Sequence, residues 1–268
     1  MNTVRRLHAG VHLLPLMLLL AGCHTVPETG RSGLSLVPES QLVSAADQTF
    51  QQMKREVPVS RDAALNARVR TIGERIVRAS GNPELPPAEQ WEFVVFDDDQ
   101  INAFAMPGGK VGFYTGMLNI MGSDDEIAVV MGHEIAHVAA KHGNERVSRQ
   151  LLTSFTAVGL GFAVRNQSEE LQQAIYLAYG LGTTLGVALP FSRQDEREAD
   201  EIGLIYSSRA GYDPRASITF WEKMGTLSKG APPEFLSTHP SYGTRINHLR
   251  AIMPRAMEEY RAAKARGL

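Results

Sequence analysis

The chain has little of several features that would point to a specialised class of protein. It has one cysteine, Cys23, in 268 residues, so no disulfide can form within it. Its 27 basic and 29 acidic residues nearly cancel, so it lacks the strongly basic face that nucleic-acid binding requires. Hydrophobic residues make up 43% and charged residues 21%, which excludes collagen-like and disordered chains. An ordinary globular protein without a nucleic-acid partner is therefore expected.

The N-terminal segment has the features of an export signal. Two arginines precede an apolar run at residues 11–20, which is shorter than the roughly 20 residues of a membrane span. The sequence Leu-Ala-Gly-Cys at residues 20–23 resembles the bacterial lipobox, which predicts removal of residues 1–22 and acylation of Cys23. A plain signal peptide or anchor with an incidental cysteine is the alternative. His24 replaces the aspartate that favours inner-membrane retention, so the outer membrane is the expected location.

The rest of the chain divides into a short linker and one domain. Residues 23–38 are rich in small and turn-forming residues, and we interpret them as a tether that follows the acylated cysteine. No boundary interrupts residues 39–268. Strands are expected at 91–96, 103–105 and 110–114, the last two as an antiparallel hairpin around Pro107-Gly108-Gly109.

Helical patterns account for most of the remaining residues. Ser123, with Glu126 three residues later, is a capping box, and Gly143 is expected to end the helix that it starts. The chain is therefore predicted to be an α+β domain, mostly helical, with a small antiparallel or mixed sheet. Helices are expected over residues 62–80, 123–141, 193–210 and 243–263, and Pro254 is expected to kink or split the last one.

The helix expected over residues 123–141 carries His133-Glu134-Ile135-Ala136-His137, an H-E-x-x-H motif. The spacing of four places both imidazoles on one helix face, one turn apart, where they can bind one Zn²⁺ ion. Glu134 lies next to them and can take a proton from water that the metal activates. Apolar flanks indicate a buried helix, and two core histidines bonded to the backbone are the alternative.

A catalytic zinc ion also needs a third protein ligand. Within the acidic helix expected over residues 193–210, Glu196 and Asp200 are four residues apart and share a face. Glu196 can ligate the metal, while Asp200 bonds the free N–H of a ligand histidine. A solvated, charged helix face is the alternative. His142 is interpreted as a histidine favoured by the dipole at a helix C-terminus, and not as a ligand.

Four segments in this order resemble peptidase family M48, a gluzincin family that includes HtpX, the CAAX prenyl proteases and a periplasmic lipoprotein branch. They cover roughly residues 40–250. The resemblance implies a zincin-type metalloprotease domain with its sheet beside the zinc helix. The four segments are Asn102-Ala103-Phe104 with Pro107-Gly108-Gly109, the H-E-x-x-H motif, Glu196-Arg197-Glu198-Ala199-Asp200, and Thr238-His239-Pro240 with Arg245-Ile246.

The resemblance also implies an activity and a ligand set. It implies a zinc-dependent metalloendopeptidase with one Zn²⁺ ion per chain, held by His133, His137 and Glu196. Glu134 would be the general base, and Asp200 would orient a ligand histidine. The substrates would be polypeptides.

The same resemblance assigns roles to four further residues. His239 would face the metal, either as a donor to the developing oxyanion or as a reversible cap. Arg245 would orient His239 or bind the substrate. Asn102 and Ala103 would support an extended substrate that pairs with their strand. A helix-terminal histidine, a surface ion pair and a turn residue are the alternatives for His239, Arg245 and Asn102.

Residues 171–191 carry no charge, but polar residues, glycines and Pro190 interrupt them, and we interpret residues 151–191 as a helical hairpin over the active site.

The anchor and the motif together predict a location. A lipid on Cys23 would hold the enzyme at the periplasmic face of the bacterial envelope. Misfolded or misassembled envelope proteins are then the expected substrates. A zinc-bearing chaperone or assembly factor with latent proteolysis is the alternative.

Overall fold

The computed structural model describes residues 23–158, 191–227, 233–240 and 242–268. The signal peptide predicted for residues 1–22 lies outside the described residues, as does most of the hairpin predicted for residues 151–191. Among the helices that are described, none combines the length and the apolar character needed to cross a membrane.

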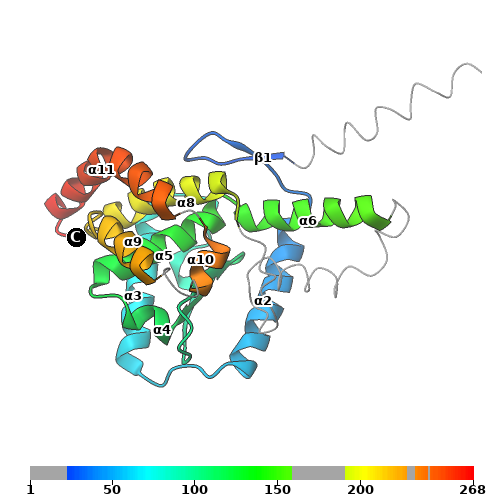
Figure 1. Ribbon diagram of the computed structural model, residues 1–268, viewed down its shortest axis with the longest axis horizontal. Helices are drawn as coiled ribbons and strands as arrows, with labels where there is room; N and C mark the ends of the chain where they lie inside the picture. The colour runs from blue at the N-terminus through cyan, green and yellow to red at the C-terminus, as the bar shows by residue number, and fades with distance from the viewer. Residues whose placement is uncertain (1–22, 159–190, 228–232, 241) are drawn as a thin grey trace, which may run out of the picture.

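Helices surround one small sheet, which confirms the mostly helical α+β class (Figure 1). A two-stranded hairpin precedes them at the N-terminal end of the described chain. The elements are β1 (Cys23–Thr25), β2 (Ser32–Leu34), α2 (Glu39–Glu56), α3 (Ala63–Ser80), the 3₁₀ helix η1 (Ala88–Gln90), β3 (Glu92–Phe96), β4 (Ala103–Met106), β5 (Lys110–Tyr114), α4 (Thr115–Asn119), α5 (Asp124–Ala139), α6 (His142–Val158), α8 (Arg193–Arg209), α9 (Ala216–Leu227), α10 (Glu234–Thr238) and α11 (Tyr242–Ala265).

The three-stranded sheet has the order β3-β5-β4. β4 and β5 are antiparallel, as expected, and β3 is parallel to β5, so the sheet is mixed. Gly108 and Gly109 both have φ near 77° in the β4–β5 turn, a conformation that residues with a Cβ rarely adopt. β4 lies at one edge of the sheet and contacts α5, which places an edge strand beside the H-E-x-x-H helix.

The α5 helix lies in the core, in contact with α3, α8, α9 and β4 (Figure 1). Ser123 caps its first turn by accepting a hydrogen bond from the Glu126 N–H. Its residues are buried on nearly every face, as the apolar sequence around the motif indicates. It packs closely against α8. Each helix has a glycine at the crossing, Gly132 in α5 and Gly203 in α8, so no side chain separates the two backbones.

The end of one predicted helix and the interpretation of His142 differ from the structure. The helix expected over residues 123–141 ends at Ala139, and α6 begins at His142. Lys141, not Gly143, has the left-handed conformation at this break, with φ of 55°. His142 therefore starts a new helix, so its interpretation as a histidine at a helix C-terminus is wrong. α11 is one helix with Pro254 inside it, so this proline does not split it.

The segment predicted as a tether has a structure of its own. Cys23 and Leu34 are partners in the antiparallel pairing of β1 with β2. Val26, in the connecting turn, is fully buried and belongs to the main core cluster. Figure 1 shows this N-terminal hairpin, residues 23–34, next to α6 and α8. The side chains of its turn make the contacts described below.

Candidate metal centre

Four buried side chains converge where α5, α8 and α10 meet. His133 and His137 come from adjacent turns of α5, and their Nε2 atoms lie 3.0 Å apart. Glu196, in the first turn of α8, places Oε2 3.5 Å from His133 Nε2 and Oε1 3.5 Å from His137 Nε2. His239 follows α10 and places Nδ1 2.9 Å from Glu196. One ligand atom of each residue lies within 4.8 Å of the others, and we call these four residues the metal site.

The metal site has the chemistry that a metal ion requires. Two imidazole nitrogens and a carboxylate oxygen are the ligand types of catalytic zinc sites. The Nδ1 atoms of both histidines are held from outside, His133 by Asp200 at 3.1 Å and His137 by His142 at 2.9 Å. Their Nε2 lone pairs are therefore left for a shared ligand. The residues present fit a metal ion.

The charges around the site favour a cation. Burial would raise the pKa of Glu196, but the positive charges of His239 and Arg245 hold it well below its usual range. Burial and Arg245 would lower the pKa of His133, but hydrogen bonds to Asp200 and Glu196 outweigh them and raise it to about 9. A positive charge at His133 is thus stabilised by two buried carboxylates. Burial lowers the pKa of His137, which favours the neutral imidazole that a metal ligand must be.

Glu134 points to the same space from the next position of α5. It is 2% exposed, and its Oε1 atom has no hydrogen-bond partner among the described residues. The Nε2 atom of His239 lies 3.5 Å from that oxygen. Burial raises the pKa of this carboxyl, against the charges of His239 and His133. A partly unsatisfied carboxylate with a raised pKa is typical of a proton-transferring group.

The edge strand β4 lies beside Glu134. The backbone N–H of Ala105 bonds the Glu134 carboxylate, which connects the strand to the site. Ala103 pairs with Phe113 on β5, so its far side is the free edge of the three-stranded sheet. Asn102 is 1% exposed, and its side-chain oxygen accepts from the Ala103 N–H at 3.0 Å. The two residues thus lie at the start of the edge strand, where the resemblance placed them.

Arg245 holds the carboxylates of the site together. Its Nε donates to Asp200 at 2.7 Å, and its Nη1 lies 2.6 Å from Glu196. The guanidinium also stacks 3.7 Å above the ring of Trp221. Arg245 is 1% exposed, so it is not a surface ion pair. Its Nη2 atom also lies 3.1 Å from Nδ1 and 3.3 Å from Nε2 of His133, whereas His239 stacks on Phe235 with ring centroids 4.5 Å apart.

Sequence reasoning missed two residues that lie next to the site. His142, which is fully buried, joins His137 to Glu198, with its Nε2 atom 2.9 Å from the Glu198 carboxylate. The sequence held a signal for this contact, because Glu198 lies inside the E-x-x-A-D segment, two residues before Asp200. This contact was missed because one helix was expected to run to Lys141 and end at Gly143, which placed His142 at its C-terminus and allowed for no break at Lys141.

The family comparison agrees with this geometry. The model of Peptidase family M48 matches residues 63–253, which contain every residue of the metal site. The chain belongs to peptidase family M48. This confirms the family expected from the four segments, and with it a metal-dependent peptidase fold.

M48 relatives come from bacteria and from mitochondria. The chain is 30% identical over 256 residues to the beta-barrel assembly-enhancing protease of Escherichia coli (strain K12), which is 91% of this chain and 52% of the relative. It is 38% identical over 178 residues to mitochondrial metalloendopeptidase OMA1 of Arabidopsis thaliana, which is 65% of this chain and 34% of the relative. The OMA1 of Schizosaccharomyces pombe is 36% identical over 190 residues, 70% of this chain and 53% of the relative. This M48 chain therefore spans a third to a half of their length.

Proposed function

We propose that this M48 protein is a zinc-dependent endopeptidase. The observation that carries the proposal is the convergence of two histidines and a carboxylate next to Glu134, a buried acid. His133, His137 and Glu196 would hold one Zn²⁺ ion, and Asp200 would orient His133 through its Nδ1 atom. Two nitrogens and one oxygen leave a fourth position for water or substrate, as catalytic zinc sites require.

The chain's own side chains would move the protons. When bound, a zinc ion would lower the pKa of water to about 7 and polarise the peptide carbonyl. Glu134 would accept the proton from water and deliver it to the leaving amine, and its raised pKa brings it closer to neutral pH, where a general base is most effective. His239, 3.5 Å from Glu134, would donate to the oxyanion that forms at the scissile carbonyl.

An extended polypeptide would bind along the free edge of β4. β4 is an edge strand of the three-stranded sheet, and it is fixed to the site through Ala105 and Glu134. Main-chain hydrogen bonds to such an edge hold a substrate in register without regard to its side chains. Asn102 would fix the start of the strand through the Ala103 N–H.

Glu134→Gln is the test of this function. The variant should retain one zinc ion per chain and lose at least about 100-fold of casein cleavage, the contribution typical of a general base. Glu196→Gln is the matched partner, because it should lose most of the zinc. Full proteolysis by Glu134→Gln would overturn the mechanism, and unchanged zinc in Glu196→Gln would move the third ligand elsewhere.

One observation favours a second candidate function, a zinc-bearing chaperone or assembly factor with latent proteolysis. The Nδ1 atom of His239 lies 3.2 Å from His133 Nε2 and 2.9 Å from Glu196, so His239 can close the site as a fourth ligand. His239→Ala then separates the roles: cleavage should rise if this residue is a cap and fall if it is an oxyanion donor. If Glu134→Gln still rescues a deletion strain, the assembly role is favoured.

We further propose that the protein is lipid-anchored at the periplasmic face of the bacterial envelope, with the outer membrane as the more favoured site. The proposal rests on the lipobox-like sequence before Cys23, which is exposed, and on the similarity to the beta-barrel assembly-enhancing protease of Escherichia coli. Misfolded or misassembled envelope proteins would be its substrates. The Cys23→Ser variant should no longer fractionate with membranes, and its mass should lack the acyl chains. Retention of the acyl chains would overturn the anchor.

A further inference from the structure

The N-terminal hairpin contacts the elements that carry the metal site. Arg31, in its turn, bridges α6 and α8: its Nε donates to Glu198 at 2.5 Å, and its Nη2 donates to Glu145 at 2.6 Å. The hydroxyl of Thr29 also donates to Glu198. Both acids are buried, at 7% and 3% exposure, so water screens these contacts little.

Glu198 is part of a chain of hydrogen bonds that runs from the hairpin to a histidine of the metal site. If the Nε2 atom of His137 faces the metal, its Nδ1 atom carries the proton and donates to His142 Nδ1 at 2.9 Å. His142 then carries its own proton on Nε2 and donates to Glu198 at 2.9 Å. Every group in this chain has the partner that its protonation requires, provided that Glu198 is ionised.

The carboxylate of Glu198 is well stabilised as an anion. It accepts hydrogen bonds from Arg31 Nε at 2.5 Å, from His142 Nε2 at 2.9 Å and from the Thr29 hydroxyl. Two of these three donors belong to the hairpin. The hairpin therefore supplies much of the charge compensation for the Glu198 carboxylate.

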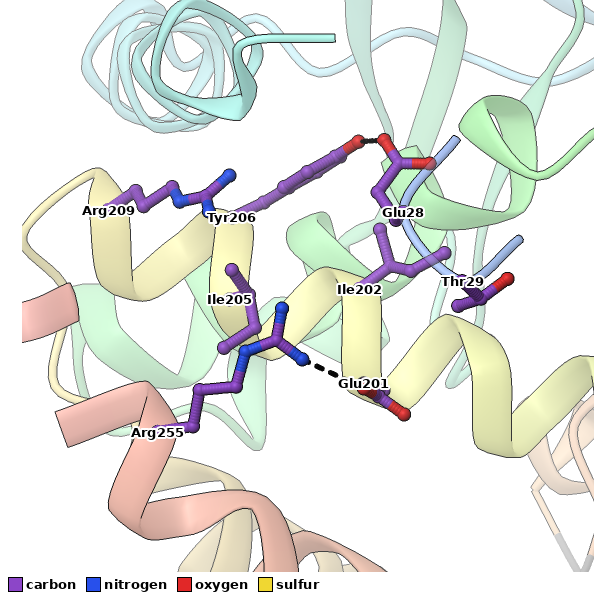
Figure 2. A pocket seen from close by; sticks show the side chains of 8 residues that line it. All are labelled: Glu28, Thr29, Glu201, Ile202, Ile205, Tyr206, Arg209 and Arg255. Atoms are coloured by element: carbon purple, nitrogen blue, oxygen red, sulfur yellow. Dashed lines mark hydrogen bonds and ion pairs between the residues drawn. The ribbon is translucent and has the colours of Figure 1, made fainter. Parts of the chain in front are cut away.

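Separate contacts fix the hairpin on α8. The Tyr206 hydroxyl donates to the Glu28 carboxylate, and Figure 2 shows both side chains, with Thr29 and Ile202, lining one cavity. The volume of this cavity is about 210 Å³. Asn82 of the loop after α3 also donates to Glu28, at 2.7 Å. Because Val26 is buried in the core as well, the part of the turn that precedes Arg31 is anchored at two points.

We propose that Arg31, Glu198 and His142 are positioning residues that fix the proton and the orientation of His137, so that the N-terminal hairpin is a structural part of the metal site. His133 is oriented directly by a carboxylate of α8, Asp200. His137 is oriented less directly, because His142 lies between it and the Glu198 carboxylate, and the N-terminal hairpin holds that carboxylate. The inference rests on the proposed function, because it requires that His137 binds the metal.

Metal affinity and cobalt spectra test this inference. Arg31→Gln and Glu198→Gln should each weaken Zn²⁺ binding by 10–100-fold in competition with a chelator, which is the usual cost of losing such a partner. In the Co²⁺-substituted protein, both should shift or weaken the visible absorption bands, because the ligand field at His137 changes. Thr29→Ala, at an exposed turn residue, should act in the same direction with a smaller effect and without unfolding the chain.

The control lies on the same helix. Glu201→Gln removes an ion pair with Arg255, 3.0 Å away, that does not reach the metal site, so it should bind Zn²⁺ within about 2-fold of the wild type. The double variant of Arg31 and Glu198 should bind no more weakly than Glu198→Gln alone, since the two residues act in one chain of contacts. Arg31→Lys should recover part of the affinity because the charge returns without the fork geometry.

The outcomes separate this inference from the proposed function. If the wild type binds no metal, both are overturned. If the wild type binds zinc and Glu134→Gln loses cleavage, but Arg31→Gln and Thr29→Ala keep wild-type affinity and cobalt spectra, this inference alone fails. Weaker binding and altered spectra in folded Arg31→Gln, with Glu201→Gln unchanged, support it.

Discussion

Replacement of Gly203 by alanine tests whether the close crossing of α5 and α8 sets the geometry of the metal site. A Cβ atom at Gly203 would lie 2.6 Å from the Gly132 carbonyl carbon and from the His133 nitrogen. Ordinary contacts begin near 3.4 Å, so the helices would have to separate by about 0.8 Å. α5 carries His133, and α8 carries Glu196, so this separation would draw the ligands apart.

The two expected effects of Gly203→Ala differ in size. Overpacking typically costs 1–3 kcal/mol of stability, and the better helix propensity of alanine returns about 1 kcal/mol, so the net loss should be about 0–2 kcal/mol. A displacement of about 1 Å at a catalytic site can cost 100-fold in rate. A 100-fold loss of kcat/KM corresponds to about 2.7 kcal/mol of activation free energy, which exceeds the expected loss in the free energy of unfolding.

The assay compares casein cleavage, zinc content and urea unfolding for Gly203→Ala and a control. Gly122→Ala is the control, because its new Cβ would meet only the Glu126 carboxylate at 3.7 Å. The control should match the wild type in all three measurements. If Gly203→Ala cleaves casein and binds zinc like the wild type, the helix crossing does not determine the ligand geometry and the reasoning is refuted.

Two further predictions concern the buried charges. Arg245→Met leaves Asp200 and Glu196 without their cation, so we expect a loss of about 3–5 kcal/mol in urea unfolding without metal, part of which added zinc restores; a loss below 1 kcal/mol would contradict this. For Glu198, the pKa is about 2 in the folded chain and 4.5 as the reference value, so its stabilising effect is complete above pH 4.5 and is lost as the pH falls toward 2. Glu198→Gln should accordingly flatten the acid side of the stability curve between these pH values, and an unchanged slope would refute the assignment.

The sequence by itself determined the features that depend on neighbours a few residues apart. The spacing of His133 and His137, and that of Glu196 and Asp200, fixes which side chains share a helix face. Ser123 marks a helix start through one hydrogen bond to the third residue after it. These signals predicted α5, α8 and the β4–β5 turn, because each is decided by local geometry.

Only the tertiary structure decided which of these faces meet. The partners of Arg245 are the carboxylates of Asp200 and Glu196 and the ring of His133, and not His239, which the resemblance offered as one of its partners. Arg31 reaches Glu198 across 167 positions, and no local pattern in a segment read as a tether indicates that contact. The break at Lys141, a residue without the freedom of glycine, turns His142 toward His137. Such contacts follow from how helices pack in three dimensions, because burial and charge pairing select them only after the chain has folded.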